Sequence, residues 1–359
     1  MTLIFQRIIP MKKLLLLLIP SILLFGCKKD TTDFGKPLTK VAFGSCAYQF
    51  IPDKKIYRLI ADENPDLFIY GGDNIYGDFF ALAPGTPEYI DGCYKQLFEA
   101  PDFMYLYDRV PILPIWDDHD FGQNDGTTNN PVKAEAKKLF FKWWHIPSTA
   151  ARANRPDGGI YDSYMYGDDA HRVQIILMDW RWNHDNYKVG GVGGAIAGYD
   201  TIMDPNATFL GAEQWAWLKE QFLKPAKLRL ILASTQFCAS KNGSENWEIM
   251  PLEKQKMFDL IKETQANDII FMSGDVHYGD LSMIQQTGMY PIYDVTSSGI
   301  THNESSASPN IYRVATPMVE RNYGMIDIDW DANSVTLNVK DHAGVAKIVK
   351  TLNLDDLKF

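Results

Sequence analysis

Short apolar runs alternate along most of the chain with segments whose apolar residues recur at helical spacing. The runs are typical of buried strands and lie at 40–43, 67–70, 110–115, 173–177, 228–233 and 268–272. The helical segments each show an apolar face and lie at 56–63, 86–98, 132–144, 213–222 and 251–263. Three alternating segments predict an antiparallel meander at 323–330, 334–340 and 345–352. This order predicts an α/β fold in which two packed sheets are flanked by helices on both sides.

Carboxylate and imidazole side chains directly follow three of these apolar runs. The segments are Gly71-Gly72-Asp73-Asn74-Ile75-Tyr76-Gly77-Asp78, Trp116-Asp117-Asp118-His119-Asp120 and Ser273-Gly274-Asp275-Val276-His277. Strand ends in α/β sheets are where ligand sites form, and clustered Asp and His are typical metal ligands. The pattern therefore predicts one metal site built from all three segments.

The spacing within each segment supports a metal site but leaves a structural alternative open. The glycine pair lets the backbone turn so that Asp73 and Tyr76 face one ion, whereas the alternative is a turn with a packed tyrosine. The adjacent carboxylates of the second segment repel each other unless a cation neutralises them, or unless part of the cluster is solvated. Asp275 and His277 share one strand face, and the alternative for the histidine is a hydrogen-bonded place in the core.

The cysteines add one further candidate ligand. Once Cys27 is set aside, Cys46, Cys93 and Cys238 remain, and this odd number is not a disulfide framework. Cys46 follows the apolar run Val41-Ala42-Phe43, so it lies at another strand end. A thiolate there suits a borderline or trivalent metal, while an inert core cysteine is the alternative.

Composition limits the class of protein without identifying it. The 359 residues are 46% hydrophobic and 22% charged, which is typical of a globular chain with an ample core. The net charge of −10 argues against nonspecific nucleic-acid binding, which needs a basic surface. A phosphate-bearing substrate stays possible because bound cations invert the local field. The composition does not indicate an oligomeric state.

The first residues predict export rather than folded structure. Lys12-Lys13 and the apolar stretch 14–25 form a signal peptide that ends at Leu24-Phe25-Gly26-Cys27, which resembles a bacterial lipobox. We expect a signal peptide at 1–27, lipidation of Cys27, a flexible tether at 28–39 and one domain at 40–359. The residue after Cys27 is Lys28 and not the aspartate that retains enteric lipoproteins in the inner membrane, so the outer membrane is favoured. A single transmembrane anchor is the alternative, and Met11 is a second candidate start.

Several of these segments together point to a family. The matching elements share order and spacing and lie at 43–46, 65–78, 116–120, 159–163, 179–181 and 273–277. In this respect the chain resembles the alkaline phosphatase D family, the PhoD-like metallophosphatases, over residues 40 to 282. The resemblance implies a four-layer α/β/β/α metallophosphatase sandwich, phosphoester hydrolysis, and a site that holds ferric iron (Fe3+) with calcium (Ca2+).

The resemblance also implies roles for individual residues. The iron ligands would be Cys46, Asp73, Tyr76 and His277. Asp73 would bridge to the calcium, which Asp118 and Asp275 would help to bind, with Asp117 as a substitute for Asp118. His119 would lie by the leaving-group oxygen. Asn124 and Arg181 would contact phosphate, although Arg181 can equally be a structural partner of Asp179.

The sequence thus predicts an exported, lipid-anchored, metal-dependent phosphatase or phosphodiesterase that uses a metal-activated water. Its substrate would be a small or polymeric phosphoester. The alternatives are a dedicated phosphodiesterase acting on phospholipid head groups or cell-wall polymers, and a catalytically inactive surface binding lipoprotein. A glycan hydrolase is disfavoured because the carboxylates follow metal-ligand patterns. Trp180 and the Gly- and Asn-rich loop 183–208 depart from the family and bear on substrate choice.

Overall fold

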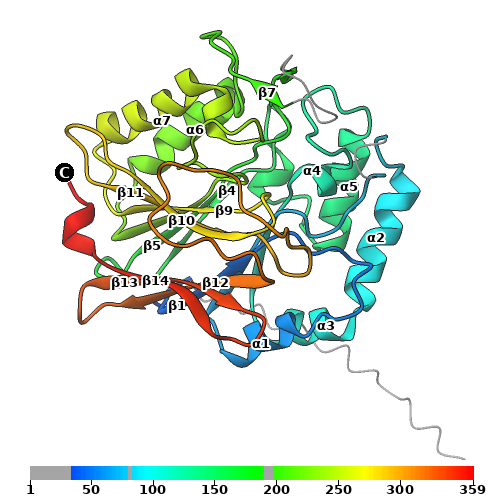
Figure 1. The fold of residues 1–359 in the computed structure, drawn as a ribbon, viewed down its shortest axis with the longest axis horizontal. Helices are drawn as coiled ribbons and strands as arrows, with labels where there is room; N and C mark the ends of the chain where they lie inside the picture. Colours follow the sequence, from blue (N-terminus) through cyan, green and yellow to red (C-terminus); the bar gives the residue numbers. More distant parts are fainter. Residues whose placement is uncertain (1–33, 80–82, 190–197) are drawn as a thin grey trace, which may run out of the picture. The chain divides into compact units, whose positions relative to one another are not determined.

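Two six-stranded mixed sheets form the framework of the computed structural model, which describes residues 34–79, 83–189 and 198–359. The first sheet has the order β14 (Ala346–Asn353), β13 (Ser334–Asp341), β12 (Asn322–Asp329), β1 (Lys40–Gly44), β2 (Leu67–Gly71) and β3 (Ile112–Ile115). The second has the order β10 (Gly279–Ile284), β11 (Ile292–Ser297), β9 (Ile269–Ser273), β8 (Leu228–Leu232), β5 (Val173–Leu177) and β4 (Asp162–Tyr166). Within the described residues the sheets stack face to face (Figure 1).

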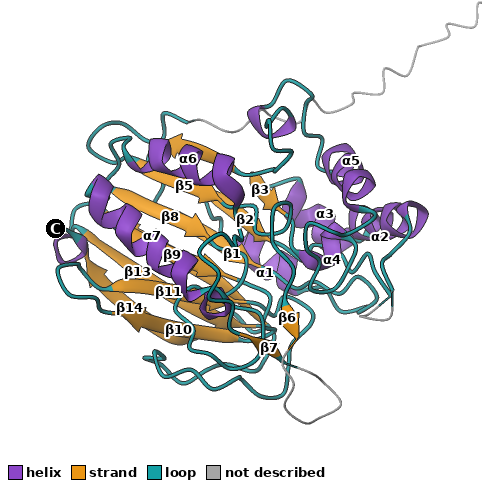
Figure 2. Ribbon diagram, turned by 90° about the horizontal axis from the view of Figure 1, so that it is seen from above, coloured by secondary structure: helices purple, strands orange, loops and turns teal. Residues whose placement is uncertain are grey.

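Helices cover the outer faces of both sheets. Those of the second sheet are α6 (Gly211–Phe222) and α7 (Pro251–Thr264), which lie across β5, β8 and β9 (Figure 2). Against the first sheet and its edge lie α1 (Ile56–Asp62), α2 (Pro87–Glu99), α3 (Pro101–Tyr107) and α5 (Lys133–Trp143). The shorter elements are α4 (Asp118–Phe121), η1 (Ala151–Ala153), β6 (Lys188–Val189), β7 (Tyr199–Asp200), η2 (Trp247–Ile249) and η3 (Leu354–Leu357). The predicted α/β/β/α fold class is confirmed.

Parallel pairing explains why the polar segments gather at one edge. β1, β2 and β3 run parallel, and so do β5, β8, β9 and β11, so their carboxyl ends share one edge of each sheet. Five of them, β1, β2, β5, β8 and β9, are buried on both faces, which is why they read as continuous apolar runs. At this edge the Ser45 N–H donates to Ser297 O at 3.1 Å and joins the two sheets.

The predicted elements match the observed ones closely, with some omissions. The terminal meander is confirmed as β12, β13 and β14, paired antiparallel. β3 contains Pro114 and lies at the edge of its sheet, where a missing N–H is tolerated. The sequence analysis missed the short helix α3 and the strands β4, β10 and β11, whose polar residues obscure the strand pattern. Part of the loop 183–208 forms the β6–β7 hairpin, and its glycine run lies outside the described residues.

The described cysteines form no disulfide with one another, and most of the N-terminal segment lies outside the described residues. Cys46, Cys93 and Cys238 are all buried free thiols. The predicted signal peptide, its alternative membrane anchor and Cys27 lie outside the described residues, as does most of the tether. Within the part of the chain that the structure describes, no helix has the length and apolar character needed to cross a bilayer.

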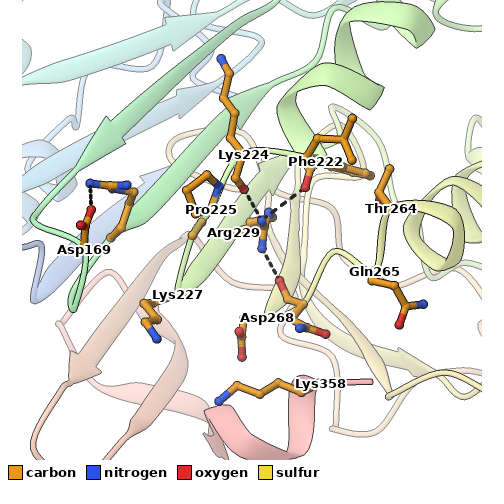
Figure 3. Close-up of a pocket in the computed structure, with 14 residues that line it drawn as sticks. Asp169, Phe222, Lys224, Pro225, Lys227, Arg229, Thr264, Gln265, Asp268 and Lys358 are labelled. Atoms are coloured by element: carbon orange, nitrogen blue, oxygen red, sulfur yellow. Dashed lines mark hydrogen bonds and ion pairs between the residues drawn. The ribbon is translucent and has the colours of Figure 1, made fainter.

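A basic cavity of about 540 Å³ lies at the amino ends of β5, β8 and β9 (Figure 3). Its wall carries Arg172, Lys224, Lys227, Arg229 and Lys358, with Asp169 and Asp268 as its carboxylates. The Arg229 guanidinium donates to backbone carbonyls, at 2.7 Å to Asn267 O and at 2.6 Å to Lys224 O. This edge is opposite to the one where the predicted site residues gather.

Candidate metal centre

Unusual backbone conformations aim the predicted ligands into one place. Cys46, Asp73, Asp275 and His277 have φ values of 62°, 48°, 69° and 61°. Residues other than glycine rarely adopt this left-handed region, and such strain clusters at functional sites. The loops also pack closely, because a Cβ added at Gly72 (φ 96°) would collide with Asp117. The strand ends therefore present four of the predicted ligands at the cost of local strain.

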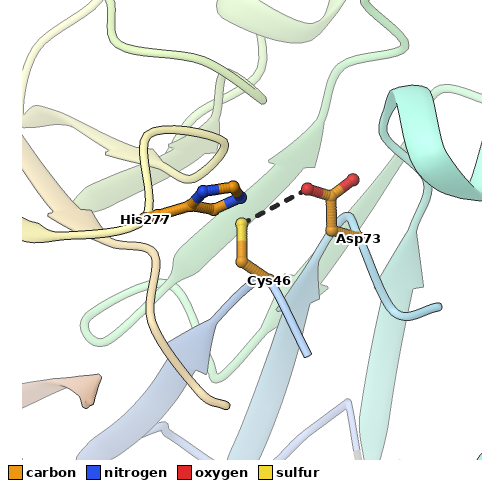
Figure 4. Close-up of side chains that lie close together, drawn as sticks. All are labelled: Cys46, Asp73 and His277. Atoms are coloured by element: carbon orange, nitrogen blue, oxygen red, sulfur yellow. Dashed lines mark hydrogen bonds between the residues drawn. The ribbon is translucent and has the colours of Figure 1, made fainter. Parts of the chain in front are cut away.

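The predicted iron ligands lie together. Ligand atoms of Cys46, Asp73 and His277 all fall within 4.8 Å of one another (Figure 4). The Cys46 thiol donates to Asp73 Oδ2 at 3.3 Å. Tyr76 Oη completes the set, 3.0 Å from His277 Nε2. The structure thus brings a thiol, a carboxylate, a phenol and an imidazole to one point.

The predicted calcium ligands form an adjoining group. Asp117, Asp118 and Asp275 offer oxygens within 4.8 Å of one another, and Asp73, Asp118 and His119 form a further such group. Asp73 therefore shares one group with Cys46 and His277 and another with Asp118 and His119, as a carboxylate that bridges two ions would. Asp118 shares a group with Asp73, whereas Asp117 is held by Arg181 Nε, so the geometry favours Asp118 as the ligand.

Burial makes this concentration of carboxylates costly without cations. Asp73, Asp117 and Asp118 are each at most 2% exposed, and Asp73 Oδ1 accepts no hydrogen bond from any described residue. Burial, together with the neighbouring acidic groups, raises the pKa of Asp73 and of Asp275 well above its ordinary value. Burial also raises the pKa of the Cys46 thiol to about 12. Cations held here would offset these penalties, so the donor set fits a pair of metal ions.

Arg181 is a buried cation of this cluster. Its guanidinium is 0% exposed and donates to Asp117 and to both oxygens of Glu245, at 2.7 and 2.8 Å. Its backbone N–H, not its guanidinium, bonds Asp179, at 3.0 Å. Together with Asp118 Oδ1, 3.8 Å from its Nη2, these contacts make Arg181 a charge partner of three carboxylates, and the predicted phosphate contact stays a prediction.

His119 and Asn124 lie beside the same cluster. His119 Nδ1 is 3.0 Å from Asp78 Oδ1, so the ring is held by a carboxylate on its far side. Burial opposes protonation of this ring, but Asp118 and Asp78 outweigh it and raise the pKa of His119 to about 9. Asn124 lines the neighbouring cavity.

That cavity has a volume of about 420 Å³ and an acidic wall. Its carboxylates are Asp125, Glu245, Asp275 and Glu304, and none of the described residues that line it is Lys or Arg. Tyr199, His277 and Tyr278 also line it. Because it opens beside Asp275 and His277, it is the route by which a substrate would reach the clustered ligands.

Sequence reasoning missed three residues that the structure places here: Asp125, Glu245 and His302. Asp125 and Glu245 share a 4.8 Å group with Asp118, and the His302 ring lies 4.0 Å from that of His277. His302 follows strand β11, so the rule that found the other segments would have found it had β11 been predicted. Glu245 sits in a polar loop and has no comparable signal.

Comparisons with known proteins agree with this picture. A model of the PhoD-like phosphatase family matches residues 41–322. Alkaline phosphatase D of Bacillus subtilis (strain 168) is 23% identical over an alignment of 280 residues that covers 67% of this chain and 46% of that protein. This chain therefore spans about half the length of that curated relative.

Two solved structures share the fold. The structure of PhoD matches with a TM-score of 0.69 at 18% identity and covers 89% of this chain and 69% of that one. GAP50, the anchor in the inner membrane complex of Plasmodium, matches with a TM-score of 0.54 at 10% identity over 89% of this chain and 90% of that one. At such identities these likenesses establish the fold alone, and function has to be argued from the site.

Proposed function

Because this chain belongs to the PhoD-like phosphatase family, we propose that it hydrolyses phosphoesters with two metal ions held at the carboxyl edge of its sheets. The observation that carries the proposal is Asp73, a buried carboxylate that forms one ligand group with Cys46 and His277 and another with Asp118 and His119. Its Oδ1 accepts no hydrogen bond from the described residues. A binding protein that had lost catalysis would have no reason to keep so costly a group.

The donor set suggests which ion each cluster would take. Cys46, Asp73, Tyr76 and His277 would hold ferric iron, since thiolate and phenolate favour a strong Lewis acid. Asp73, Asp118 and Asp275 offer oxygen alone, which suits calcium. When bound, such ions activate a water and stabilise the phosphoryl oxygens during in-line displacement.

His119 is the residue best placed to donate a proton. Asp78 fixes its Nδ1, which leaves Nε2 as the nitrogen that can serve the leaving group. The Asp78 carboxylate beside Nδ1 favours the protonated ring, as a general acid for the departing alkoxide requires. Arg181 acts on the site indirectly, because it holds Asp117 and Glu245 in place.

The acidic cavity favours diesters over monoesters. Asp125, Glu245 and Glu304 line the route to the site without a lysine or arginine among the described lining residues. A monoester carries about two negative charges near neutral pH and a diester carries one, so the wall repels the monoester more. We therefore propose phosphodiesterase activity as the main reaction, on a substrate with a neutral or cationic leaving group.

The cellular location of the chain is the subject of a second proposal. We propose that the chain is an exported lipoprotein anchored through Cys27, with 28–39 as its tether and 40–359 as its domain, because 12–27 has the order of a lipoprotein signal. Metabolic labelling with a fatty acid tests it. Cys27→Ser should lose the label, and an equally labelled variant would refute the anchor.

The enzymatic proposal is tested with bis-p-nitrophenyl phosphate and p-nitrophenyl phosphate on the purified full-length chain. We expect hydrolysis of both, with the higher kcat/KM on the diester. Asp275→Asn should abolish it. Asp268→Asn is the matched control, since Asp268 shares with Asp275 a positive φ, 58° against 69°, and a raised pKa, but lies in the basic cavity. Equal activity of the two variants would refute the assignment.

A further inference from the structure

The segment that follows β11 folds back over the candidate metal centre. The backbone N–H groups of Thr301 and His302 both donate to Cys46 O, at 3.2 and 3.1 Å. The Glu304 N–H donates to His277 O at 2.8 Å. This segment is therefore fastened to the two loops that present Cys46 and His277, and its own side chains are held in register with them.

Glu304 of this segment lies 3.7 Å from Nδ1 of His277, and His302 reaches a second proposed ligand, Tyr76. His302 Nδ1 lies 2.8 Å from Tyr76 Oη, and His277 Nε2 lies 3.0 Å from the same oxygen. The two imidazole rings lie with centroids 4.0 Å apart and an angle of 34° between their planes. The Tyr76 oxygen thus has a ring nitrogen on each of two sides.

The number of protons on Tyr76 and on the two histidines determines which ring nitrogen donates a hydrogen bond to the Tyr76 oxygen. A phenol oxygen carries one proton, so it cannot donate to both rings, and one ring nitrogen has to donate to it. A histidine nitrogen that binds a metal carries no proton. Under the proposed function His277 is such a ligand, which leaves Nδ1–H of His302 as the donor to the Tyr76 oxygen. Hydrogen bonds from residues outside the ligand set orient the ligands and change the affinity for the metal.

We propose that His302 is a positioning residue that donates an Nδ1–H hydrogen bond to Tyr76 and holds its oxygen toward the first ion. This inference rests on the proposed function and adds a residue to it. Its role is to hold Tyr76, so the effects of replacing it should appear in the properties of the tyrosine–metal bond and in iron affinity.

The test compares three variants of the full-length chain loaded with iron. His302→Phe keeps the ring size and removes the donor. His302→Asn restores a donor, because the asparagine amide nitrogen takes a position similar to that of Nδ1. His342→Phe makes the same chemical change at an exposed histidine in the turn between β13 and β14, and serves as the matched control. Thermal melts verify that all three fold.

Two readouts follow the metal bond directly: the tyrosinate-to-iron absorption band, and the iron dissociation constant from chelator competition. For His302→Phe we expect the band to move to longer wavelength, because a phenolate without the hydrogen bond is a stronger electron donor, and the dissociation constant to rise about 10–100-fold. His302→Asn and His342→Phe should stay close to wild type.

Other outcomes overturn the inference in distinguishable ways. If wild type shows the band and His302→Phe leaves band and affinity unchanged, the positioning role is wrong and the proposed function stands. If both His302 variants lose iron completely, His302 is itself a ligand rather than a positioning residue. If wild type binds no iron and shows no band, the iron assignment and this inference fail together.

Discussion

The two cavities at opposite edges of the second sheet differ in how their charges are satisfied. The basic cavity is the larger, about 540 Å³ against about 420 Å³. Its most buried cation, Arg229, donates to backbone carbonyls, and Arg172 pairs with Asp169. The acidic cavity adjoins the buried carboxylates Asp117, Asp118 and Glu245, which share the single guanidinium of Arg181. The comparison teaches that unbalanced buried charge, rather than the size of a cavity, marks the functional site.

The backbone supports the same distinction. Strained left-handed residues carry four of the proposed ligands at the carboxyl edge. In the basic cavity Gln265 and Asp268 also have positive φ, but Gln265 there ends helix α7 as an ordinary C-cap. Strain is therefore informative where it coincides with buried donors that lack partners.

Removing the bound metal ions should have the largest effect on the acidic site. Exhaustive treatment with a chelator is expected to abolish phosphodiester hydrolysis, and iron with calcium should restore it. The melting temperature should also fall, because ions that bind only the folded state stabilise it. Full activity in protein shown by elemental analysis to be free of metal would contradict the account.

Asp73→Asn should separate catalysis from stability. Loss of the shared ligand is expected to lower kcat/KM about a thousandfold, which corresponds to several kcal/mol of transition-state stabilisation. In chelator the same variant should melt at a higher temperature than wild type, because burial raises the pKa of Asp73 and its charge is unfavourable there. A lower melting temperature than wild type in chelator would show that this carboxylate is structurally satisfied.

Arg181→Met tests how much the buried ion pairs of the metal centre contribute to the free energy of unfolding. Truncating one partner of a buried ion pair typically costs about 3–5 kcal/mol, and Asp117 and Glu245 would both lose theirs. Arg172→Met is the control in the basic cavity, where an exposed pair contributes about 1 kcal/mol or less. Urea unfolding measures both, and equal losses would remove the distinction between the cavities.

Asp268→Asn is expected to change the pH dependence of stability and to leave activity unchanged. Burial raises the pKa of Asp268 to about 7 from an ordinary 3.8, although Lys358 and Arg229 oppose the shift. The folded state therefore binds this proton more tightly, and its stabilising contribution is lost as pH rises from about 4 to about 7. Asparagine stays neutral, so the melting temperature of the variant should fall less over this range. Parallel curves for variant and wild type would contradict this.

Much of the fold and site could be predicted because strand, turn and ligand are local in the sequence. Apolar runs such as 67–70 and 268–272 match β2 and β9 closely, and the residues that follow them meet because parallel strands share an edge. Asp73 and His277 could be placed by that rule alone. Glu245 could not, since its partner Arg181 is 64 residues away and no local pattern links them.

The roles of single residues were harder to predict than their location. The sequence places Arg181 at the site, as a phosphate contact or as a partner of Asp179, and the three-dimensional structure adds that Asp117 and Glu245 accept hydrogen bonds from its guanidinium. His302 was missed because Asp294, Thr296 and Ser297 hide the strand that precedes it. Both cases depend on contacts between distant segments, which a single sequence does not reveal.

The central claim is that Asp73 is shared by two metal ions. The most direct test is X-ray diffraction from crystals grown with iron and calcium, with anomalous data collected on both sides of the iron edge. The account predicts an iron peak among Cys46 Sγ, the Asp73 carboxylate and the His277 ring, and calcium density against Asp73, Asp118 and Asp275. Side chains that keep the hydrogen bonds described above, with no anomalous peak between them, would contradict it.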